Sequence, residues 1–426
     1  MEQFIIEGGN PLNGTVIPSG NKNEVLPLLA ACILTEEPVI LHNVPDILDV
    51  KAMRSLLQSL GVEITALSPT SWQIHAKNVH SGNLDPELCR QIRASILLAG
   101  PMVARTGEIH LPPPGGDVIG RRRLDSHILA LKALGVEIDY DRIFHFHTKH
   151  LKGANILLDE ASVTATENAI MACSKAEGVS IIRNAASEPH IQQLCQFINK
   201  LGGKIENIGS NTLKITGVKD LRGGEFSIGP DYLEVISYIG AAAVTKGSIR
   251  IKDAGIQYLD MIRLNFKRIG VRWDVEGEDI VVPGSQKMKV EPDLGGVIPE
   301  ISVMPWPAFP TDLMSVAIVV ATQSEGTILF HDWMYPSRMF FTDKLVGMGA
   351  RIILCDPHRC IVQGPSRLYG EKMESPDIRA GMALLLAALS AEGTSVIRNV
   401  GQIDRGYGQV DQKLAALGAK ITRLKR

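Results

Sequence analysis

The sequence predicts a mixed α/β protein made of six repeats, each about 71 residues long, arranged as two similar domains around a cleft. Three observations lead to this prediction: one pattern recurs along the whole chain, amphipathic helices end at glycines, and β-rich stretches follow tight turns. The chain has 426 residues, of which 45% are hydrophobic and 21% are charged, so it can bury more than one core.

The repeat consists of an apolar segment, a turn, a β-rich stretch, a loop and an amphipathic helix that ends at a glycine. The closing glycines recur at intervals close to one sixth of the chain and are Gly61, Gly135, Gly202, Gly270, Gly349 and Gly418. Glycine is typical of this position because it readily adopts the left-handed backbone conformation that ends a helix. Six repeats are too many for one core, so we expect three on each side of a boundary near Gly229.

The spacing of apolar residues distinguishes the elements within a repeat. In the first repeat, apolar side chains at i, i+3, i+4 and i+7 predict a helix with one buried face, formed by Met53, Leu56, Leu57 and Leu60. Segments 28–34 and 382–389 are apolar throughout, which predicts helices that are buried on every side. After each such segment come a turn and a short β-rich stretch such as 39–41, which predicts a strand. The repeat therefore indicates central helices surrounded by sheets.

The second repeat is the longest because it contains segment 111–123, in which three prolines and paired glycines precede three successive arginines. This composition does not favour packing in a core, and surface loops often carry functional groups. We therefore expect a functional loop here. The alternative is a tolerated insertion whose charges are simply solvated.

Charged residues stand at the starts of several buried apolar segments. They are Lys22, Arg93, Asp312 and Asp377, each from a different repeat. Each residue alone fits a helix cap or a local ion pair. Equivalent helix starts are expected to converge on one cleft, which would bring cations and carboxylates together. Such a set suits a reaction between anions, because cations neutralise phosphate while carboxyl groups accept and donate protons.

Composition and charge exclude several classes of protein. Lysine and arginine number 44 against 46 aspartates and glutamates, so no broad positive field favours nucleic acid or an anionic membrane. The longest apolar run, 382–389, is far shorter than the ~20 residues of a membrane span. The N-terminus lacks a signal sequence and the six cysteines form no C-x-x-C pair, so we expect a cytoplasmic protein.

The sequence also predicts neither a cofactor nor a metal. No phosphate loop, dinucleotide fingerprint or nucleophile elbow occurs in it. The 11 histidines are scattered along the chain. His145, His147 and His150 belong to an alternating stretch, which we interpret as an exposed strand rather than a metal site.

Several motifs together resemble the UDP-N-acetylglucosamine 1-carboxyvinyltransferases, a family of enolpyruvyl transferases. They occupy 19–23, 92–95, 115–120 with the residues that follow, 309–312 and 403–407. The resemblance extends from about residue 4 to residue 424. It implies an inside-out α/β barrel with a first domain at 22–229, which carries the mobile loop 111–123, and a second domain at 1–21 plus 230–426. It also implies a monomer, with weak self-association as the alternative.

The resemblance implies that an enolpyruvyl group passes from phosphoenolpyruvate to the 3-hydroxyl of UDP-N-acetylglucosamine, with loss of phosphate. This is the first committed step of peptidoglycan synthesis. The implied catalytic residues are Asp117 as the acid toward carbon, Asp312 as the base toward the hydroxyl, Lys22 and Arg405. The implied substrate-binding residues are Lys22, Asn23, Arg93, Arg122, Asp125, His127, Ser162, Val163, Asp312, Met334, Arg338, Asp377, Ile378 and Arg405.

The sequence departs from the family pattern at several positions. Asp117 stands where many members have cysteine, so we expect the chain to be insensitive to fosfomycin, an epoxide that alkylates that cysteine. Leu48, Glu160 and Tyr232 replace the common Lys, Lys and Arg, and Arg123 replaces a common Pro. These changes concern the acceptor more than the phosphoenolpyruvate chemistry, and Arg121 and Arg123 are candidates to compensate for them.

Two alternatives to the leading function remain open. One is an enolpyruvyl transferase for a different hydroxyl acceptor. Shikimate 3-phosphate is disfavoured as that acceptor because Asn21-Lys22-Asn23 does not match the Ser-Lys-Ser signature of the shikimate enzymes. The other is a noncatalytic paralogue that regulates the pathway, against which the retention of both Asp117 and Asp312 argues.

Overall fold

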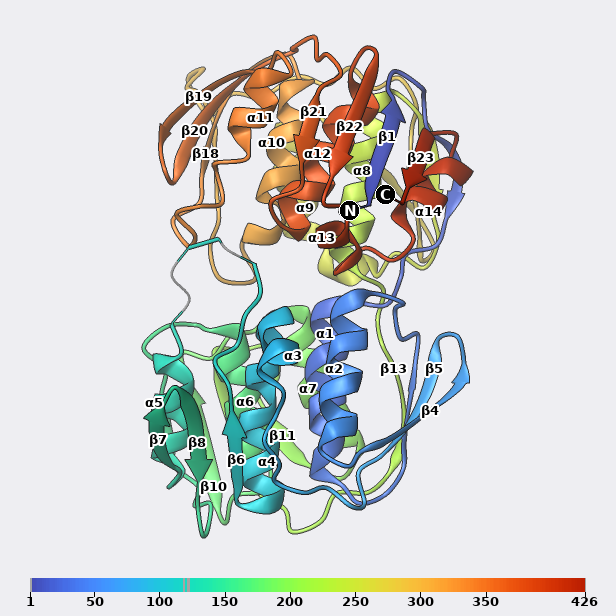
Figure 1. Cartoon of the computed structure of the whole chain (residues 1–426). Coiled ribbons are helices and arrows are strands. Elements are labelled where there is room, and N and C mark those ends of the chain that lie inside the picture. Colours follow the sequence, from blue (N-terminus) through green and yellow to red (C-terminus); the bar gives the residue numbers. More distant parts are fainter. Residues whose placement is uncertain (1, 118, 121–122, 426) are drawn as a thin grey trace. The chain divides into compact units, whose positions relative to one another are not determined.

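A computed structural model describes residues 2–117, 119–120 and 123–425 of the chain (Figure 1). The described residues form two compact units. Unit 1 contains 2–19, 119–120 and 230–425, and unit 2 contains 20–117 and 123–229. Gly20 and Asn21 belong to unit 2, where the Asn21 N–H donates a hydrogen bond to the Gly229 carbonyl over 2.8 Å.

Unit 2 places its central helices against one another and its sheets outside them (Figure 1). The central elements are α1 (Lys22–Ala31), η1 (Cys32–Leu34), η2 (Arg93–Leu98), α4 (Ala99–Thr106) and α6 (Val163–Cys173). The other helices are α2 (Leu48–Ser59), α3 (Pro86–Gln91), α5 (Asp125–Ala133) and α7 (Pro189–Lys200). The predicted buried segment 28–34 therefore runs through α1 and η1, and all seven of its residues are buried because they face other elements on every side.

Unit 2 has three sheets among its described residues, with the strand orders β13-β3-β5-β4, β6-β8-β7 and β11-β12-β10-β9. The strands are β3 (Val39–His42), β4 (Glu63–Ser68), β5 (Ser71–His75), β6 (Glu108–Leu111), β7 (Glu137–Asp141), β8 (Ile143–His147), β9 (Asn155–Leu157), β10 (Val179–Arg183), β11 (Lys204–Glu206), β12 (Thr212–Thr216) and β13 (Gly224–Ser227). The last strand of the unit, β13, pairs parallel with the first, β3, so the chain leaves the unit beside the point where it enters.

Unit 1 repeats this plan with helices α8 (Tyr232–Thr245), α10 (Met314–Thr322) and α12 (Ile378–Ser390) packed against one another at its centre. Every residue of α8 and α10 is buried. The other helices are η3 (Ile256–Tyr258), α9 (Asp260–Arg268), α11 (Thr342–Gly347), α13 (Gly401–Asp404), α14 (Val410–Ala416) and η4 (Thr311–Leu313), which leads directly into α10. The predicted segment 382–389 lies inside α12 and is entirely buried.

The three described sheets of unit 1 have the orders β21-β22-β1-β23, β15-β16-β14-β2 and β17-β18-β20-β19. Their strands are β1 (Gln3–Glu7), β2 (Asn13–Val16), β14 (Ser248–Ile251), β15 (Asp274–Glu276), β16 (Asp279–Val282), β17 (Glu300–Ser302), β18 (Gly326–His331), β19 (Arg351–Asp356), β20 (Arg359–Gly364), β21 (Lys372–Glu374), β22 (Thr394–Arg398) and β23 (Lys420–Leu424). Antiparallel pairing of β1 with β23 joins the N-terminal and C-terminal segments of the chain.

The six closing glycines adopt the expected left-handed conformation. Their φ angles lie between 82° and 106°, and each follows directly after the last turn of a helix. Because side chains other than glycine are strained at such angles, the glycine repeat reports a real backbone requirement. The sequence prediction of six similar units is confirmed at this level.

The sheet of the second repeat differs from the other five. It has three strands, β6-β8-β7, and an isolated parallel bridge between Asn83 and His110 stands where the others have a fourth strand. Loop 111–123, which we singled out from its composition, follows β6 directly. Positions 118, 121 and 122 of this loop lie outside the described residues. Within the described parts of the chain, no helix is long and apolar enough to span a membrane.

Candidate active site

Lys22 is the first residue of α1, and its position is set by local capping. The Asn21 side-chain oxygen accepts hydrogen bonds from the N–H groups of Asn23 and Glu24, so the helix begins at a defined residue. The Lys22 ammonium lies 2.8 Å from a carboxylate oxygen of Asp49, and both side chains are buried. A paired, buried ammonium at a helix start is well placed to bind an anion.

Arg93 opens η2 and lies beside the loop of the second repeat. A guanidinium N–H of Arg93 donates to the carbonyl oxygen of Arg123 over 2.9 Å. The paired glycines of the loop pass so close that a Cβ at Gly115 would lie 1.8 Å from the Arg90 carbonyl oxygen. A Cβ at Gly116, where φ is 104°, would lie 2.9 Å from Cβ of Arg93. The loop therefore needs both glycines to bring the neighbouring Asp117 to its place in unit 2.

His127 is fully enclosed in unit 2 by α5 and α6. Nδ1 of its ring lies 2.9 Å from the Asn168 amide nitrogen, and Nε2 lies 3.0 Å from the Thr164 hydroxyl. The Asn168 amide can only donate from nitrogen, so Nδ1 accepts and Nε2 carries the proton. Burial, assisted by the positive charge of Arg93, lowers the pKa of His127 to about 3. The imidazole is therefore neutral and can act as a hydrogen-bond donor at physiological pH.

Ser162 and Val163 form the start of α6. The Ser162 hydroxyl accepts a hydrogen bond from the Ala165 N–H over 3.4 Å, and Val163 is the first helical residue. Helix starts favour anions because their N–H groups point outward and the helix dipole is positive there. Two acids, Asp159 and Glu160, precede this start, so the local charge depends on their partners.

Arg123 supplies that partner. Its guanidinium lies 2.7 Å from Asp159 and 3.9 Å from both Glu160 and Asp125. The Ser126 hydroxyl donates to Asp159 over 2.6 Å, and this hydrogen bond, followed by the one from Arg123, lowers the pKa of Asp159. The arginine that departs from the family pattern thus lies among the acids that precede and face α6.

In unit 1, Asp312 lies between two buried arginines at the start of α10. One carboxylate oxygen accepts from Arg338 over 3.0 Å, and the other accepts from Nε of Arg379 over 3.2 Å. The two arginine side chains are only 3% and 4% exposed. Burial disfavours their charge, but Asp312 together with other nearby groups more than offsets this, so the pKa of both arginines is raised. Asp312 is thereby surrounded by fixed positive charge.

Asp377 and Ile378 start the neighbouring central helix, α12. The Asp377 carboxylate accepts from the N–H groups of Arg379 and Ala380 over 2.8 and 2.9 Å. Arg379 also donates to the Tyr407 hydroxyl over 3.2 Å. The starts of α10 and α12 are therefore tied together through Arg379.

Two further predicted residues, Met334 and Arg405, lie on other segments of unit 1. The Met334 N–H donates to Asp332 over 3.0 Å, and burial raises the pKa of that aspartate. Arg405 directly follows α13 and donates to the Gln402 side chain over 3.1 Å. Arg122, which the resemblance implies for substrate binding, lies outside the described residues.

The structure thus brings the predicted residues together in separate groups. In unit 1, Asp312 and Asp377 both lie close enough to Arg338 for their negative charges to raise its pKa. In unit 2, Arg93 lies near His127, and Asn23 adjoins Lys22. The sequence analysis assigned no role to three residues that the structure places in these groups: Asp49, Arg379 and Tyr407. Arg379 sits in the motif that begins with Asp377, which was its only sequence signal.

Comparison with known proteins bears on both fold and family. A family model described as EPSP synthase (3-phosphoshikimate 1-carboxyvinyltransferase) matches residues 6–414. The UDP-N-acetylglucosamine 1-carboxyvinyltransferase of Bradyrhizobium diazoefficiens is 55% identical, over 99% of this chain and 98% of that protein. The protein of the same name from Treponema denticola is 54% identical, over 99% of both chains.

Solved structures confirm the predicted inside-out α/β fold. The enolpyruvyl transferase NikO from Streptomyces tendae matches with a TM-score of 0.88 and 23% identity, covering 100% of this chain and 99% of that one. EPSP synthase from Acinetobacter baumannii matches with a TM-score of 0.76 and 18% identity, covering 100% of both chains. At these identities the likeness concerns the fold alone.

The buried, neutral His127 predicts a specific pH dependence of stability. The unfolded chain binds a proton at this position near pH 6.5, whereas folded unit 2 binds it only near pH 3. Stability is therefore unaffected above about pH 6.5 and falls by about 1.4 kcal/mol per pH unit below it, down to about pH 3. Proton NMR should show a constant His127 ring shift between about pH 8 and pH 4.

His127→Gln provides the matched comparison. Whatever its absolute stability, this variant should lose one proton's worth of pH dependence in urea unfolding between about pH 6 and pH 4. A His127 ring that titrates near its ordinary value, or identical pH slopes in both proteins, would contradict the prediction.

Proposed function

Because the chain belongs to the UDP-N-acetylglucosamine 1-carboxyvinyltransferase family of enolpyruvyl transferases, we propose that it transfers the enolpyruvyl group of phosphoenolpyruvate to the 3-hydroxyl of UDP-N-acetylglucosamine. The chain is a transferase, and the reaction would release phosphate at the first committed step of peptidoglycan synthesis. The observation that carries this proposal is the identity of 50–55% over 99–100% of the chain with several relatives of that name.

The proposed mechanism assigns two proton transfers to two carboxyl groups. Asp312 takes the proton from the sugar 3-hydroxyl as its oxygen bonds to C2 of phosphoenolpyruvate, while Asp117 donates a proton to the C3 methylene. The tetrahedral adduct then loses phosphate as its C–O bond breaks, and loss of a proton from the methyl group forms the enol ether product. The hydrogen bonds from Arg338 and Arg379 support this role because they fix the position of the Asp312 carboxylate.

The proposed binding roles follow from helix starts and cations. Lys22, Arg93, Arg122 and Arg405 would neutralise the phosphate and carboxylate of phosphoenolpyruvate, and the resemblance also gives Arg338 a supporting role there. The remaining residues would hold the nucleotide sugar or line its site, and these are Asn23, Asp125, His127, Ser162, Val163, Met334, Asp377 and Ile378. The neutral His127 supports this indirectly, because its Nε2 N–H holds the Thr164 hydroxyl next to Val163 at the start of α6.

The structure shows the surroundings of the positions at which the chain departs from the family pattern. Leu48 begins α2 with 43% of its surface exposed, and Tyr232 is buried against Trp306 with ring centroids 6.1 Å apart. Neither replaces the positive charge common in the family. Arg123, in contrast, lies among Asp159 and Glu160 before α6. We propose that it offsets their charge where the diphosphate of the acceptor would bind.

We further propose that the reaction takes place in the cytoplasm and serves cell-wall growth, and with it cell shape and division. All six cysteines are free, and five of them are buried, which suits a reducing compartment. Substrates such as phosphoenolpyruvate and nucleotide sugars are charged metabolites, so an enzyme acting on them must meet them inside the cell.

Phosphate release with a panel of acceptors tests the proposed function. Purified chain with phosphoenolpyruvate should release phosphate with UDP-N-acetylglucosamine and not with shikimate 3-phosphate. Activity with a different nucleotide or hydroxyl compound alone would replace the acceptor. No turnover with any acceptor, combined with retained ligand binding in calorimetry, would identify a regulatory paralogue instead of an enzyme.

Asp312→Asn should lower turnover by about 10²–10⁴-fold, because the amide cannot accept the hydroxyl proton. The side chain keeps its size, so binding of phosphoenolpyruvate measured by calorimetry should change much less than turnover. Asp343→Asn, an exposed aspartate at the start of α11, is the control and should retain full activity. Full activity of Asp312→Asn would exclude this carboxylate as the base.

Asp117 governs both turnover and sensitivity to fosfomycin in this proposal. Asp117→Ala should abolish turnover, whereas Asp117→Cys should retain part of it and become alkylated by the epoxide. The wild-type chain should not react, because a carboxylate is a poor target for alkylation. Mass spectrometry of tryptic peptides after exposure to fosfomycin measures this directly.

The native thiols make this experiment clean. Burial raises the pKa of Cys89 to about 11 and that of Cys173, Cys195 and Cys360 to about 12, so these thiols are protonated and inaccessible. Cys355 is exposed, so Cys355→Ser serves as the background for all variants. An adduct on Asp117 of the otherwise unchanged chain would refute the prediction.

A further inference from the structure

The sheet β6-β8-β7 of unit 2 presents an unusual outer face. Register pairs His110 of β6 with His145 of β8, and His145 in turn with Asp139 of β7. Side chains alternate along each strand, so His147 and Glu108 lie on this same face. The opposite face carries Ile109, Phe144, Phe146 and Ile138, which are buried or partly buried against the core of unit 2. The outer face is therefore rich in imidazoles and carboxylates.

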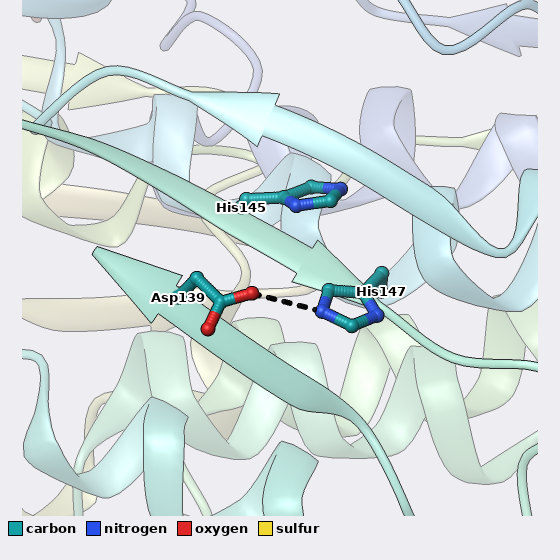
Figure 2. Close-up of side chains that lie close together, drawn as sticks. All are labelled: Asp139, His145 and His147. Carbon is teal, nitrogen blue, oxygen red and sulfur yellow. Dashed lines mark hydrogen bonds and ion pairs between the residues drawn. The ribbon is translucent and has the colours of Figure 1, made fainter. Parts of the chain in front are cut away.

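Three of these side chains converge closely enough to share a ligand. One nitrogen each of His145 and His147 and one oxygen of Asp139 all lie within 4.8 Å of one another. Figure 2 shows the two rings on β8 and the carboxylate on the neighbouring strand, with Nε2 of His147 3.1 Å from Asp139. Ligand atoms around a zinc ion lie about 2.0–2.2 Å from the metal, hence about 3–3.5 Å apart. A small rotation of exposed side chains closes that difference.

The neighbouring groups hold one of the imidazoles in place. The His110 ring stacks on His145 with centroids 4.1 Å apart and planes only 6° from parallel. Glu108 lies 3.4 Å from Nε2 of His145 and is itself fixed by a 3.0 Å hydrogen bond from Ser81. A carboxylate that accepts from one ring nitrogen leaves the lone pair of the other nitrogen for a metal and makes it more basic. Glu108 is therefore placed to orient the His145 ring without contacting the metal itself.

We propose that His145, His147 and Asp139 bind one divalent transition-metal ion of the zinc type on the outer face of β6-β8-β7. Water completes the coordination, since the carboxylate is 76% exposed and the two rings are about one third exposed. Without a metal, a contact of 3.1 Å joins Nε2 of His147 to Asp139, and metal binding would replace it.

The ligand set selects the class of metal. Imidazole nitrogen suits zinc, nickel and copper, whereas magnesium and calcium prefer an all-oxygen environment. The three ligands stand on two strands of one unit, β7 and β8, and none of them is proposed for enolpyruvyl transfer. Occupancy of the site is therefore independent of the proposed function, and either proposal can fail while the other holds.

Calorimetric titration of the full-length, untagged chain with Zn²⁺ tests the site. We expect saturable binding whose affinity falls at least about tenfold in His145→Gln, His147→Gln and Asp139→Asn. Mg²⁺ at the same concentrations should neither bind there nor compete. Enolpyruvyl transfer assayed in chelator should be unchanged in the three variants, which also reports that they are folded.

Two matched controls separate this site from other zinc ligands on the surface. His150→Gln removes an exposed histidine that pairs with Glu177 outside the cluster, and Cys355→Ser removes the exposed thiol. Both should bind Zn²⁺ as the unchanged chain does. The proposal is overturned if Zn²⁺ does not bind, if the affinity of His147→Gln equals that of the unchanged chain, or if binding is lost in either control instead.

Discussion

The central helices of both units are buried along their length, and this constrains where ionisable groups can lie. An ionised side chain in the middle of α8 or α10 would lose its hydration without a partner to compensate. Helix starts differ, because their unpaired N–H groups require acceptors and their dipole favours negative charge. The chain caps four of these starts with Asn21, Ser162, Asp231 and Asp377. Reactive groups therefore gather at one kind of position.

The same constraint explains the groups that deviate from it. Glu167 lies one turn inside α6, and burial raises its pKa, so the acid tends to its neutral form. Asp312, in contrast, is faced by two buried guanidinium groups that donate hydrogen bonds to it. Leaving either charge alone would cost more than the pair contributes, which makes the cluster of Asp312, Arg338 and Arg379 an interdependent unit. A carboxylate held in this way has its position and charge set before any substrate arrives.

The second repeat shows how a repeated fold acquires a specialised part. Its sheet has only the Asn83–His110 bridge where the other five have a fourth strand, and β6 is followed by the glycine-containing loop that passes close to Arg90 and Arg93. The imidazoles lie on the outer face of that same sheet. The second repeat thus carries both features, while its closing glycine, Gly135, keeps the left-handed conformation of the other repeats.

The sequence by itself determined the six repeats, the buried helices, the closing glycines and the residues at helix starts. These are local properties: periodicity and left-handed glycines depend on a few neighbouring residues, and they are readable in one dimension. The tertiary structure alone decided that Asp49 pairs with Lys22 and that Arg379 and Tyr407 join Asp312. It also decided that His110 and Asp139 lie beside the histidines of β8. Those pairings depend on strand register and on which helices meet, and both are settled by packing between segments far apart in the chain.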